Sequence, residues 1–444
     1  MRGRASESER KARSARRQLT RGADTIHRIV LSTFGSLGDL HPFIALGVGL
    51  RERGHEVVFA TSDYYRAKIE GLGFELRALR PNVSPDDREL VALLMDIKKG
   101  SERVLRDIMF PHLRDTYADL RAAAEGADFL LAGELVYAAP ILGEATGLPW
   151  ASVTLSPLSF LSAWDPPVLP PHPGLAKLRP LGPRVNRAVM SFGRLLTRSW
   201  IKPVLELRRE LGLPPGEHPI FEGKLSPHLA LALFSRVIGE PQPDWPSNAV
   251  ITGFASYDAK RENLGTAAPE LERFLDQGEP PIVFTLGSAA VLDPGEFYQE
   301  SAAAARELGR RAVLLMGWNP LPPDLPQEIF ATDYAPYSDV FPRAAAIVHQ
   351  GGIGTTAQAL RAGRPTLVMP YSHDQPDNAA RLERLGTSRT IPRNRYTAAR
   401  AVTELRELLG NPKYARKAEE VGRIVQAEDG VTAACDAIVA RLGG

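Results

Sequence analysis

The sequence predicts an α/β protein with two Rossmann-like domains, each a doubly wound parallel sheet, that face each other across a cleft. Short apolar runs alternate with longer helix-like segments from Ile26 onward, which is the pattern of βα units on a parallel sheet. The second half of the chain repeats this pattern, and both halves contain a strand that ends in a Gly-Ser pair. The 444 residues suffice for two domains of roughly 100–200 residues each.

The first half opens with the clearest βαβ unit. A buried strand at 27–33 leads into a loop at 34–39, and a helix follows with Pro42 in its first turn and Gly54 after its end. Further strands of this half are predicted at 56–61, 128–132, 149–155 and 229–234.

Strands of the second half are predicted at 281–286, 311–316, 345–349 and 365–369. The proline-rich segment Gly239–Asn248 follows a completed strand and indicates the boundary between the domains. We therefore expect domains over 26–240 and 241–425. A C-terminal helix is expected over 426–444, with a return to the first domain as one option. In such a pair of domains a ligand binds between the carboxyl ends of the facing strands.

Composition excludes several classes of protein. The chain is 44% apolar and 24% charged, as ordinary globular proteins are, which excludes collagen-like, coiled-coil and wholly disordered chains. Its one cysteine, Cys435, can form neither an internal disulfide nor a thiolate cluster for zinc. No apolar run reaches the ~18 residues of a membrane span. We expect a cytoplasmic protein, with peripheral contact at the inner face of the membrane as an option.

Basic residues are concentrated at the N-terminus. Residues 1–28 contain nine Lys or Arg and three acidic residues, so their net charge of +6 exceeds the +2 of the whole chain. Residues 1–25 have almost no apolar side chains and lack the apolar segment of a secretory signal, so they predict a disordered basic tail. Contact of this tail with nucleic acid or anionic lipid is the less favoured interpretation, and no nucleic-acid partner is expected.

A segment of different character lies between the two halves. Trp164–Arg184 contains seven prolines, and Leu175–Arg209 then mixes Lys and Arg with large apolar residues. This pattern predicts a lid followed by a basic amphipathic helix. A surface helix packed on the first domain is the favoured interpretation. The alternatives are a wall for an apolar substrate and a contact with a membrane surface.

The stretch Val348–Gly386 carries the most chemical information. A strand ends at His349, a glycine-rich turn follows, and a helix starts at Gly354 and Thr355. Free N–H groups at a helix start favour an anion, and glycine lets a phosphate approach the backbone closely. A diphosphate is therefore the expected ligand, although such turns also use glycine for packing alone.

A second polar group follows the next strand, where His373, Asp374 and Gln375 precede Asn378. A carboxylate and an amide at this place suit the paired hydroxyl groups of a sugar.

Together these motifs resemble the donor-binding signature of family 1 glycosyltransferases with the GT-B fold. The loop at 35–39, G-S-L-G-D, resembles the first loop of the bacterial branch, which includes glycopeptide, lipid and sterol-type enzymes. The resemblance covers nearly all of the chain after the tail. It looks closest to the rhamnosyltransferase catalytic chain of rhamnolipid synthesis.

The resemblance implies a role for each matching residue. Asp39 matches the general base that removes the proton of the acceptor hydroxyl, provided that burial raises its pKa toward neutrality. His41 is the reserve candidate, and a helix N-cap is the simpler role for Asp39 without the resemblance. The residues that match donor-binding positions are Ser288, His349, Gly351, Gly352, Gly354, Thr355, Asp374 and Gln375. Further donor contacts are expected from Ser36, Gly38, Tyr334 and Asn378.

The sequence also departs from the family pattern. Ala357 stands where plant members have the Glu that holds the ribose hydroxyls, with Gln358 beside it, which favours dTDP over UDP without settling the choice. The plant base-stacking motif is absent, and Tyr334 lies in the corresponding region. No D-x-D pair follows a strand, so the resemblance implies neither a metal nor a cofactor.

The resemblance thus implies an inverting, metal-independent glycosyltransferase. It would move a hexose or 6-deoxyhexose, with rhamnose as one candidate, from a dTDP- or UDP-sugar to a hydroxyl group of an apolar lipid, polyketide or terpenoid. Two alternatives stay open. One is a nucleotide-sugar epimerase or hydrolase of the same fold that needs no acceptor, and the other is a nucleotide-binding or NAD-dependent protein. The first loop lacks the G-x-G-x-x-G spacing of NAD proteins, and the oligomeric state is not predicted.

Overall fold

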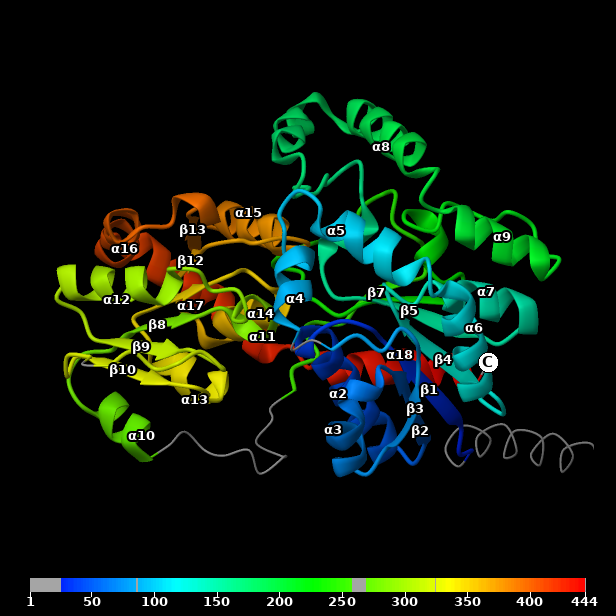
Figure 1. Cartoon of the computed structure of the whole chain (residues 1–444), viewed down its shortest axis with the longest axis horizontal. Coiled ribbons are helices and arrows are strands. Elements are labelled where there is room, and N and C mark those ends of the chain that lie inside the picture. Colours follow the sequence, from blue (N-terminus) through cyan, green and yellow to red (C-terminus); the bar gives the residue numbers. More distant parts are fainter. Residues whose placement is uncertain (1–24, 85–86, 258–268, 324, 444) are drawn as a thin grey trace, which may run out of the picture.

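The computed structural model describes residues 25–84, 87–257, 269–323 and 325–443, which form two parallel sheets with helices on both faces (Figure 1). The predicted fold class is confirmed. The predicted tail at 1–25 lies outside the described residues except for Thr25. Within the described ranges, no helix combines the length and the apolarity that crossing a bilayer requires.

The first sheet has seven parallel strands in the order β3-β2-β1-β4-β5-β6-β7. Their bounds are β1 (Arg28–Ser32), β2 (Glu56–Thr61), β3 (Glu75–Ala78), β4 (Phe129–Gly133), β5 (Trp150–Thr154), β6 (Leu229–Ala232) and β7 (Ala249–Ile251). The two edge strands, β3 and β7, were not predicted. Because β7 pairs with β6, the first sheet continues beyond residue 240, and the predicted domain boundary there is too early.

Helices cover both faces of the first sheet. Side chains alternate between the faces along each strand, so Ile29 and Leu31 pack with α2 (Leu37–Glu52), whereas Val30 packs on the other face with α6 (Leu113–Ala123). The other α-helices of this half are α3 (Arg66–Gly71), α4 (Arg88–Leu94), α5 (Gly100–Arg103), α7 (Ala138–Thr146), α8 (Pro183–Thr197) and α9 (Lys202–Glu210). A π-helix spans Val104–Met109, and short 3-10 helices span Asp63–Tyr65, Pro157–Phe160, Pro173–Leu181 and Glu222–Lys224.

The second sheet has six parallel strands in the order β10-β9-β8-β11-β12-β13. Their bounds are β8 (Ile282–Thr285), β9 (Ala312–Leu315), β10 (Ile329–Thr332), β11 (Ala346–His349), β12 (Thr366–Val368) and β13 (Ser388–Thr390). The strand order reverses between β8 and β11. Ligands of doubly wound sheets bind at such a point, outside the carboxyl ends of the two strands.

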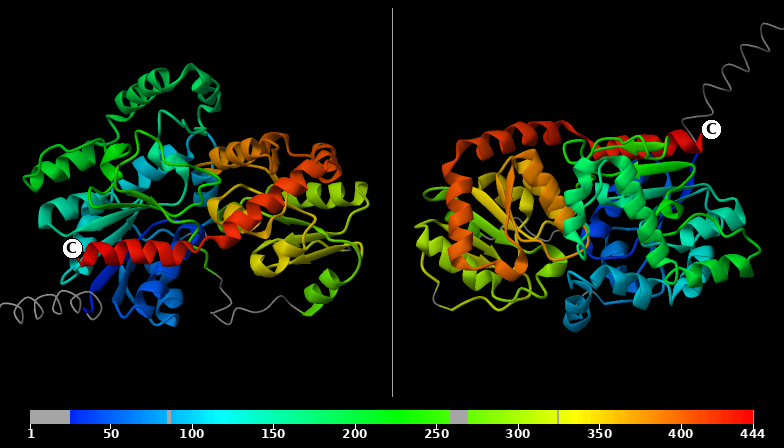
Figure 2. Two further views of the ribbon diagram at one scale, coloured as in Figure 1. Left: turned by 180° about the vertical axis from the view of Figure 1, so that it is seen from behind. Right: turned by 90° about the horizontal axis from the view of Figure 1, so that it is seen from above.

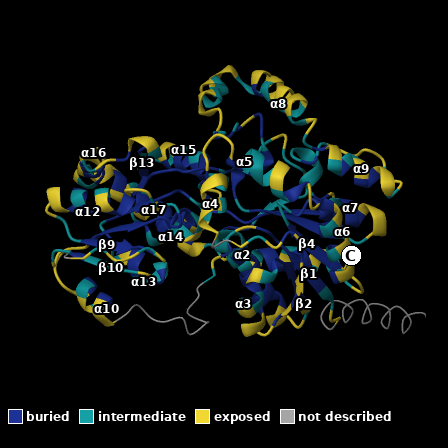
Figure 3. Ribbon diagram, viewed as in Figure 1, coloured by how far each residue is buried: buried dark blue, intermediate teal, exposed yellow. Residues whose placement is uncertain are grey.

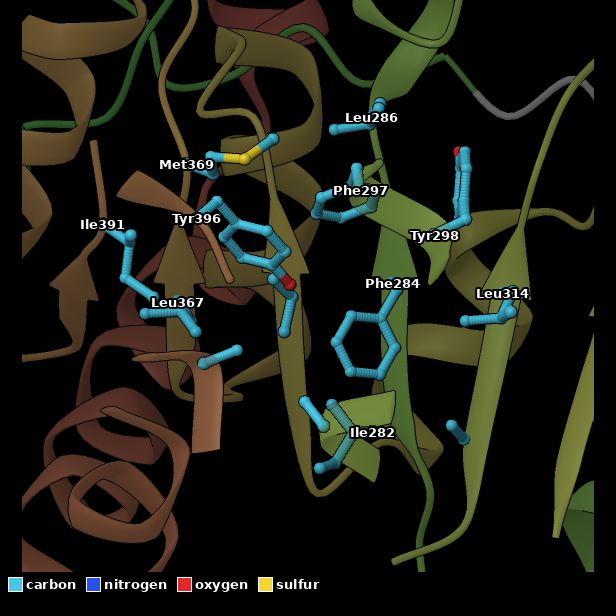
Figure 4. Close-up of a cluster of buried hydrophobic side chains, with 14 of the residues drawn as sticks. Ile282, Phe284, Leu286, Phe297, Tyr298, Leu314, Leu367, Met369, Ile391 and Tyr396 are labelled. Carbon is cyan, nitrogen blue, oxygen red and sulfur yellow. The ribbon is translucent and has the colours of Figure 1, made fainter. Parts of the chain in front are cut away.

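The α-helices of the second half are α10 (Pro269–Asp276), α11 (Gly287–Ala290), α12 (Phe297–Glu307), α13 (Tyr337–Val340), α14 (Ile353–Ala362), α15 (Gln375–Leu385), α16 (Ala398–Gly410), α17 (Pro412–Ala427) and α18 (Gly430–Leu442). One face of the sheet carries the core in Figure 4, where Phe284 lies near the rings of Phe297 and Tyr396. The ring centroids of Phe297 and Tyr396 are 5.1 Å apart. Burial of each such ring contributes about 1.5–3 kcal/mol, so this core anchors the strands that carry the loops of the second half.

Each half of the chain contributes a segment to the core of the other half. Val91 of α4 and the following Met95 pack in the core of the second sheet. In return, α18 crosses back to the first half, where Cys435 and Ile438 pack with α2 (Figure 2). The two sheets are therefore joined by packed helices as well as by the chain between them.

A buried ion network also ties the halves together. Arg381 of α15 is buried, and its guanidinium donates from Nε to Asp377 at 2.6 Å and from Nη1 to Asp165. The backbone N–H of Val168 donates to the same Asp377 at 2.9 Å. Because Asp165 and Val168 belong to the proline-rich segment of the first half, this segment is fixed on α15 of the second half.

Candidate active site

The candidate site lies where loops of the two halves meet at the strand-order reversal of the second sheet. Helix α2 of the first half contacts both α11 and α14 of the second half, and Figure 1 shows the three helices close together. Helix α11 follows β8 and α14 follows β11, so both begin at carboxyl ends of strands. The predicted residues of the first loop thus face the predicted donor loops.

Asp39 is the third residue of α2. Ser36 is the N-cap, and Asp39 Oδ2 accepts a hydrogen bond from the Ser36 backbone N–H at 2.8 Å, which completes a capping box. The N-cap alternative for Asp39 is therefore wrong in position, although Asp39 does take part in capping. Pro42 is the sixth helical residue rather than a first-turn residue, because the helix begins earlier than predicted.

Gly35 leaves room for this carboxylate. Its φ is +125°, and an added Cβ would lie 2.2 Å from Asp39 Oδ2. The Tyr65 hydroxyl donates to the Gly35 carbonyl at 2.8 Å and fixes the turn. Ser36 Oγ accepts from the Gly38 N–H at 3.2 Å, so Ser36 and Gly38 shape the loop that holds Asp39. The ring of His41, the reserve candidate, packs against Tyr257 with centroids 5.3 Å apart.

The pKa of Asp39 is raised from its ordinary value of 3.8 to about 6. Burial is the main cause, the negative charge of Glu134 adds to it, and the hydrogen bond from Ser36 opposes it. A carboxylate with this pKa is mostly ionised at neutral pH and is more basic than an exposed one. General-base catalysis at neutral pH requires a group with a pKa in this range.

Asp374 approaches from the second half of the chain. It precedes α15, and its Oδ2 accepts from Asn378 Nδ2 at 2.8 Å. The pKa of Asp374 is raised to about 7, mainly by burial and also by the charges of Asp39 and Glu134. The carboxyl groups of the two halves are thus close enough to influence each other across the site.

Asn378 and Gln375, which follow Asp374, form hydrogen bonds to the backbone of the loops around the site. Asn378 is buried and also donates to the Gly351 carbonyl at 2.9 Å, so it joins the glycine-rich turn to Asp374. Gln375 Oε1 accepts from the Tyr371 backbone N–H at 2.9 Å. Asn378 therefore positions the two loops relative to each other, whereas Gln375 fixes the shape of the loop after β12.

His373 has a conformation that the sequence does not reveal. Its φ is +57°, which is uncommon for a residue other than glycine. Its Nδ1 lies 3.1 Å from Ser101 Oγ of α5, and burial lowers its pKa to about 4. The contact joins the loop that carries Asp374 to the first half of the chain.

His349 ends β11 with a fully buried side chain. Its Nδ1 accepts from the Gly351 N–H at 3.1 Å, so the ring carries its proton on Nε2. Burial lowers the pKa of His349 to about 3, and the ring is neutral near pH 7. Among the described residues, Nε2 has no hydrogen-bond partner. A buried donor without a partner is costly, and a ligand oxygen would satisfy it.

The glycines of the turn differ in whether the backbone angle or the packing around them excludes a larger side chain. Gly351 has a φ of +88°, and an added Cβ would lie 2.8 Å from Val368 Cγ1. Gly352 is the N-cap of α14, and its added Cβ would lie 2.8 Å from Gln350 Nε2. Gly354 is exposed, and an added Cβ there would meet no atom within 4 Å. The packing of the protein does not require glycine at 354, but the approach of a ligand would.

The loop after β8 completes the candidate anion site. Gly287 has a φ of +67°, and an added Cβ would lie 2.2 Å from Gln350 Nε2 and 3.2 Å from Thr355 Oγ1. The two loops at the strand-order reversal are therefore in contact. Ser288 follows Gly287 and is exposed, whereas Thr355 is buried. In the part of the chain that the structure describes, no group of three or more His, Cys, Asp or Glu side chains is arranged to hold a metal ion.

Two exposed aromatic side chains follow the next strands of the sheet. The Gly317 N–H donates to the Asp333 carbonyl at 2.9 Å, so Trp318 and Tyr334 come directly after paired residues. Trp318 is 79% exposed and Tyr334 is 49% exposed. Tyr334 was named from the sequence as a possible donor contact, but Trp318 was not. The position of this tryptophan just after a predicted strand could have indicated it.

Comparisons with known proteins identify the family of the chain. The family model "Glycosyltransferase family 28 N-terminal domain" matches residues 29–157, and "Erythromycin biosynthesis protein CIII-like, C-terminal domain" matches residues 314–439. The O-mycaminosyltylonolide 6-deoxyallosyltransferase of Streptomyces fradiae is 35% identical over 422 residues, which cover 92% of this chain and 96% of that protein.

Solved structures share the fold. The glycosyltransferase of kitacinnamycin is similar with a TM-score of 0.71 at 22% identity, over 94% of this chain and 100% of that one. The glycosyltransferase VinC, solved in complex with dTDP, has a TM-score of 0.65 at 21% identity, over 94% of this chain and 99% of that one.

Proposed function

The chain belongs to the family 1 glycosyltransferases of the bacterial natural-product type, and from this premise we propose that it moves a hexose or 6-deoxyhexose from a dTDP- or UDP-sugar to a hydroxyl group of an apolar acceptor. The proposal includes inversion at the anomeric carbon, with Asp39 as the general base. The buried Nε2 of His349, without a partner among the described residues, is the observation that carries the donor site.

The diphosphate of the donor would bind at the start of α14. The N–H groups there lie at the strand-order reversal, and the open space at Gly354 allows close approach of a phosphate. His349 Nε2 and the exposed hydroxyl of Ser288 would add donors. Neutral donors and a helix N-terminus can stabilise the negative charge that develops on the departing diphosphate, which supports a mechanism without a metal.

The base and the sugar would extend from the diphosphate in opposite directions. Trp318 and Tyr334 lie after β9 and β10 on one side, and an exposed aromatic face is a favourable surface for a nucleobase. Asp374 lies after β12 on the other side, where its carboxyl group can accept hydrogen bonds from sugar hydroxyls. The order of these residues along the sheet matches the order of the parts of a nucleotide-sugar.

We propose dTDP rather than UDP as the preferred nucleotide, because the two differ in the 2′-hydroxyl group of the ribose. The side chain of Ala357 supplies no acceptor for a ribose 2′-hydroxyl, which favours dTDP, and the solved complex of VinC with dTDP supports the same choice. Rhamnose is one candidate sugar, on the resemblance of the sequence alone.

The reaction would be a single displacement. The acceptor oxygen forms a bond to the anomeric carbon while the bond from that carbon to the diphosphate oxygen breaks. Asp39 takes the proton of the acceptor hydroxyl, and the electron pair of the broken bond leaves on the diphosphate. Attack opposite to the leaving group inverts the anomeric configuration.

Thermal unfolding with dTDP, UDP, ADP and NAD at equal millimolar concentrations tests the donor site. A ligand that binds only the folded state raises the apparent stability by RT ln(1 + [L]/Kd). We expect the largest increase with dTDP. An increase with NAD alone would contradict the proposal. Incubation of a dTDP-sugar with and without an apolar acceptor then separates transfer from epimerisation or hydrolysis, which need no acceptor.

A further inference from the structure

We infer that α8 docks on the surface of an anionic lipid bilayer. The helix lies at the outer edge of the molecule in Figure 1, and Figure 3 shows much of it as exposed. Asn186 is the one buried residue among its 15 residues, all of which the structure describes. The helix is held to the first half, as the favoured sequence interpretation expected, but none of its apolar side chains is buried there.

A stripe of apolar side chains runs along the exposed side of α8. The stripe residues are spaced by four and three positions, which places them on one face of a helix. Phe192 is 59% exposed and Leu195 is 63% exposed. The stripe consists of Val185, Ala188, Phe192 and Leu195, with Leu181 just before the helix and Leu196 beside it.

Contacts on the inner side of α8 fix the direction of this stripe. Asn186 Nδ2 donates to the Ala163 carbonyl at 2.9 Å, and Arg194 forms an ion pair with Glu222. Thr197 Oγ1 lies 3.3 Å from His218 Nε2. These polar contacts hold α8 to the first half and leave the apolar stripe turned toward solvent.

A basic stripe runs beside the apolar one. Arg184, Arg187 and Arg198 are exposed, and within the described ranges none of them forms an ion pair with a carboxylate. Residues 166–205 contain seven Lys or Arg and no Asp or Glu. An apolar face flanked by cations suits a surface that offers both lipid chains and anionic headgroups.

The length and the charge of α8 favour a bilayer surface over a second copy of the chain as the partner of this helix. Its 15 residues extend about 22 Å, which is too short to cross a bilayer but sufficient to lie along its surface. A second copy of the chain is a poorer occupant, because a symmetric contact would bring two arginine stripes together. An anionic bilayer instead compensates their charge.

Sedimentation with lipid vesicles tests this inference on the full chain. The vesicles contain either phosphatidylcholine alone or equal parts of phosphatidylcholine and phosphatidylglycerol. We expect binding to the anionic vesicles that weakens with added salt. Phe192→Ser with Leu195→Ser should lower the partition coefficient about tenfold or more, and Arg187→Gln with Arg198→Gln should lower it about 30-fold. Ile424→Ser and Arg400→Gln, at exposed positions of other helices, are the matched controls and should bind as the unmodified chain does.

The basic N-terminal residues are present in every variant, so only the differences between variants report on α8. Equal binding of both α8 variants and the unmodified chain would overturn the inference. A variant that changes only the KM for the acceptor would overturn it in favour of a wall of the acceptor site. Loss of a dimer in the apolar variant, without vesicle binding in the unmodified chain, would overturn it in favour of a second copy. The sedimentation assay contains neither donor nor acceptor, so its outcome is independent of the proposed reaction.

Discussion

Replacement of Asp39 by Asn separates the chemical role of this residue from its role in the fold. An Asn side-chain oxygen can still accept the hydrogen bond from the Ser36 N–H, so the start of α2 should be retained. The variant cannot take up the acceptor proton. We expect kcat to fall about 10²–10⁴-fold, while the Kd for dTDP changes less than about twofold.

The same variant should be more stable than the unmodified protein, although it loses activity. The pKa of Asp39 is raised from 3.8 to about 6, and this shift corresponds to a cost of about 3 kcal/mol for holding the charge in the folded state. Because the folded-state pKa is the higher one, the cost is absent below about pH 4 and complete above about pH 6. Asp39→Asn should therefore raise the free energy of unfolding by up to about 3 kcal/mol near pH 8 and leave it nearly unchanged near pH 4.

Steady-state kinetics and denaturant unfolding at several pH values measure both effects. For the unmodified enzyme, kcat/KM should rise with pH through about 6 as Asp39 loses its proton. Asp429→Ala removes the capping side chain of α18, which accepts from the Thr432 N–H at 3.0 Å, and serves as a control that should lose stability without losing rate. An Asp39→Asn variant that keeps most of its rate would refute the assignment of the base.

Four further predictions concern binding and stability. His349→Ala should weaken dTDP binding about 10–100-fold by calorimetry, and the affinity of the unmodified chain should show no titration of this residue above about pH 5, because its pKa is about 3. Gly354→Ala should leave the free energy of unfolding unchanged or raise it by up to about 1 kcal/mol while weakening dTDP binding, whereas Gly351→Ala should destabilise the fold because of its positive φ. Trp318→Ala should weaken dTDP binding by about 1–3 kcal/mol with little change in Tm, since the side chain is 79% exposed. Arg381→Ala should lower the free energy of unfolding by about 3–5 kcal/mol, because it leaves the fully buried Asp377 without its cation, while Asp165 keeps its ion pair with Arg179.

Four outcomes would contradict these expectations. Unchanged dTDP affinity in His349→Ala would remove the imidazole from the diphosphate site. Full dTDP affinity in Gly354→Ala would mean that no ligand approaches this position, and a large loss of Tm in Trp318→Ala would indicate a packing role. An Arg381→Ala variant as stable as the unmodified chain would show that the ion network contributes little.

The central strands could be predicted from the sequence because they are buried on both faces and therefore form continuous apolar runs. The edge strands could not be predicted, neither β3 and β7 of the first sheet nor β10 and β13 of the second. In β3 only Leu76 is buried, and β7 has three half-buried residues, so neither segment shows a pattern that differs from a loop. The boundary near residue 240 failed for the same reason, since it was placed before an undetected strand.

The candidate site was predicted in part. The glycine-rich turn and Asp374 could be proposed as donor-binding positions because their residue types indicate their chemistry. The pairing of Asn378 with Gly351 and the contact of His373 with Ser101 join residues far apart in the chain, so a single sequence carries no signal for them. The raised pKa of Asp39 depends on the packing of both halves, which the residue types around it do not reveal.

The return of α18 to the first half has a consequence for the synthesis of the chain. Domains generally fold as units, with the N-terminal one first as the chain emerges from the ribosome. Here the surface of α2 that receives Cys435 and Ile438 stays uncovered until the whole second half has been translated. The first half can therefore complete its core only after α18 has emerged. In a nascent chain that stops before α18, the apolar surface of α2 would remain exposed, although this half was translated first.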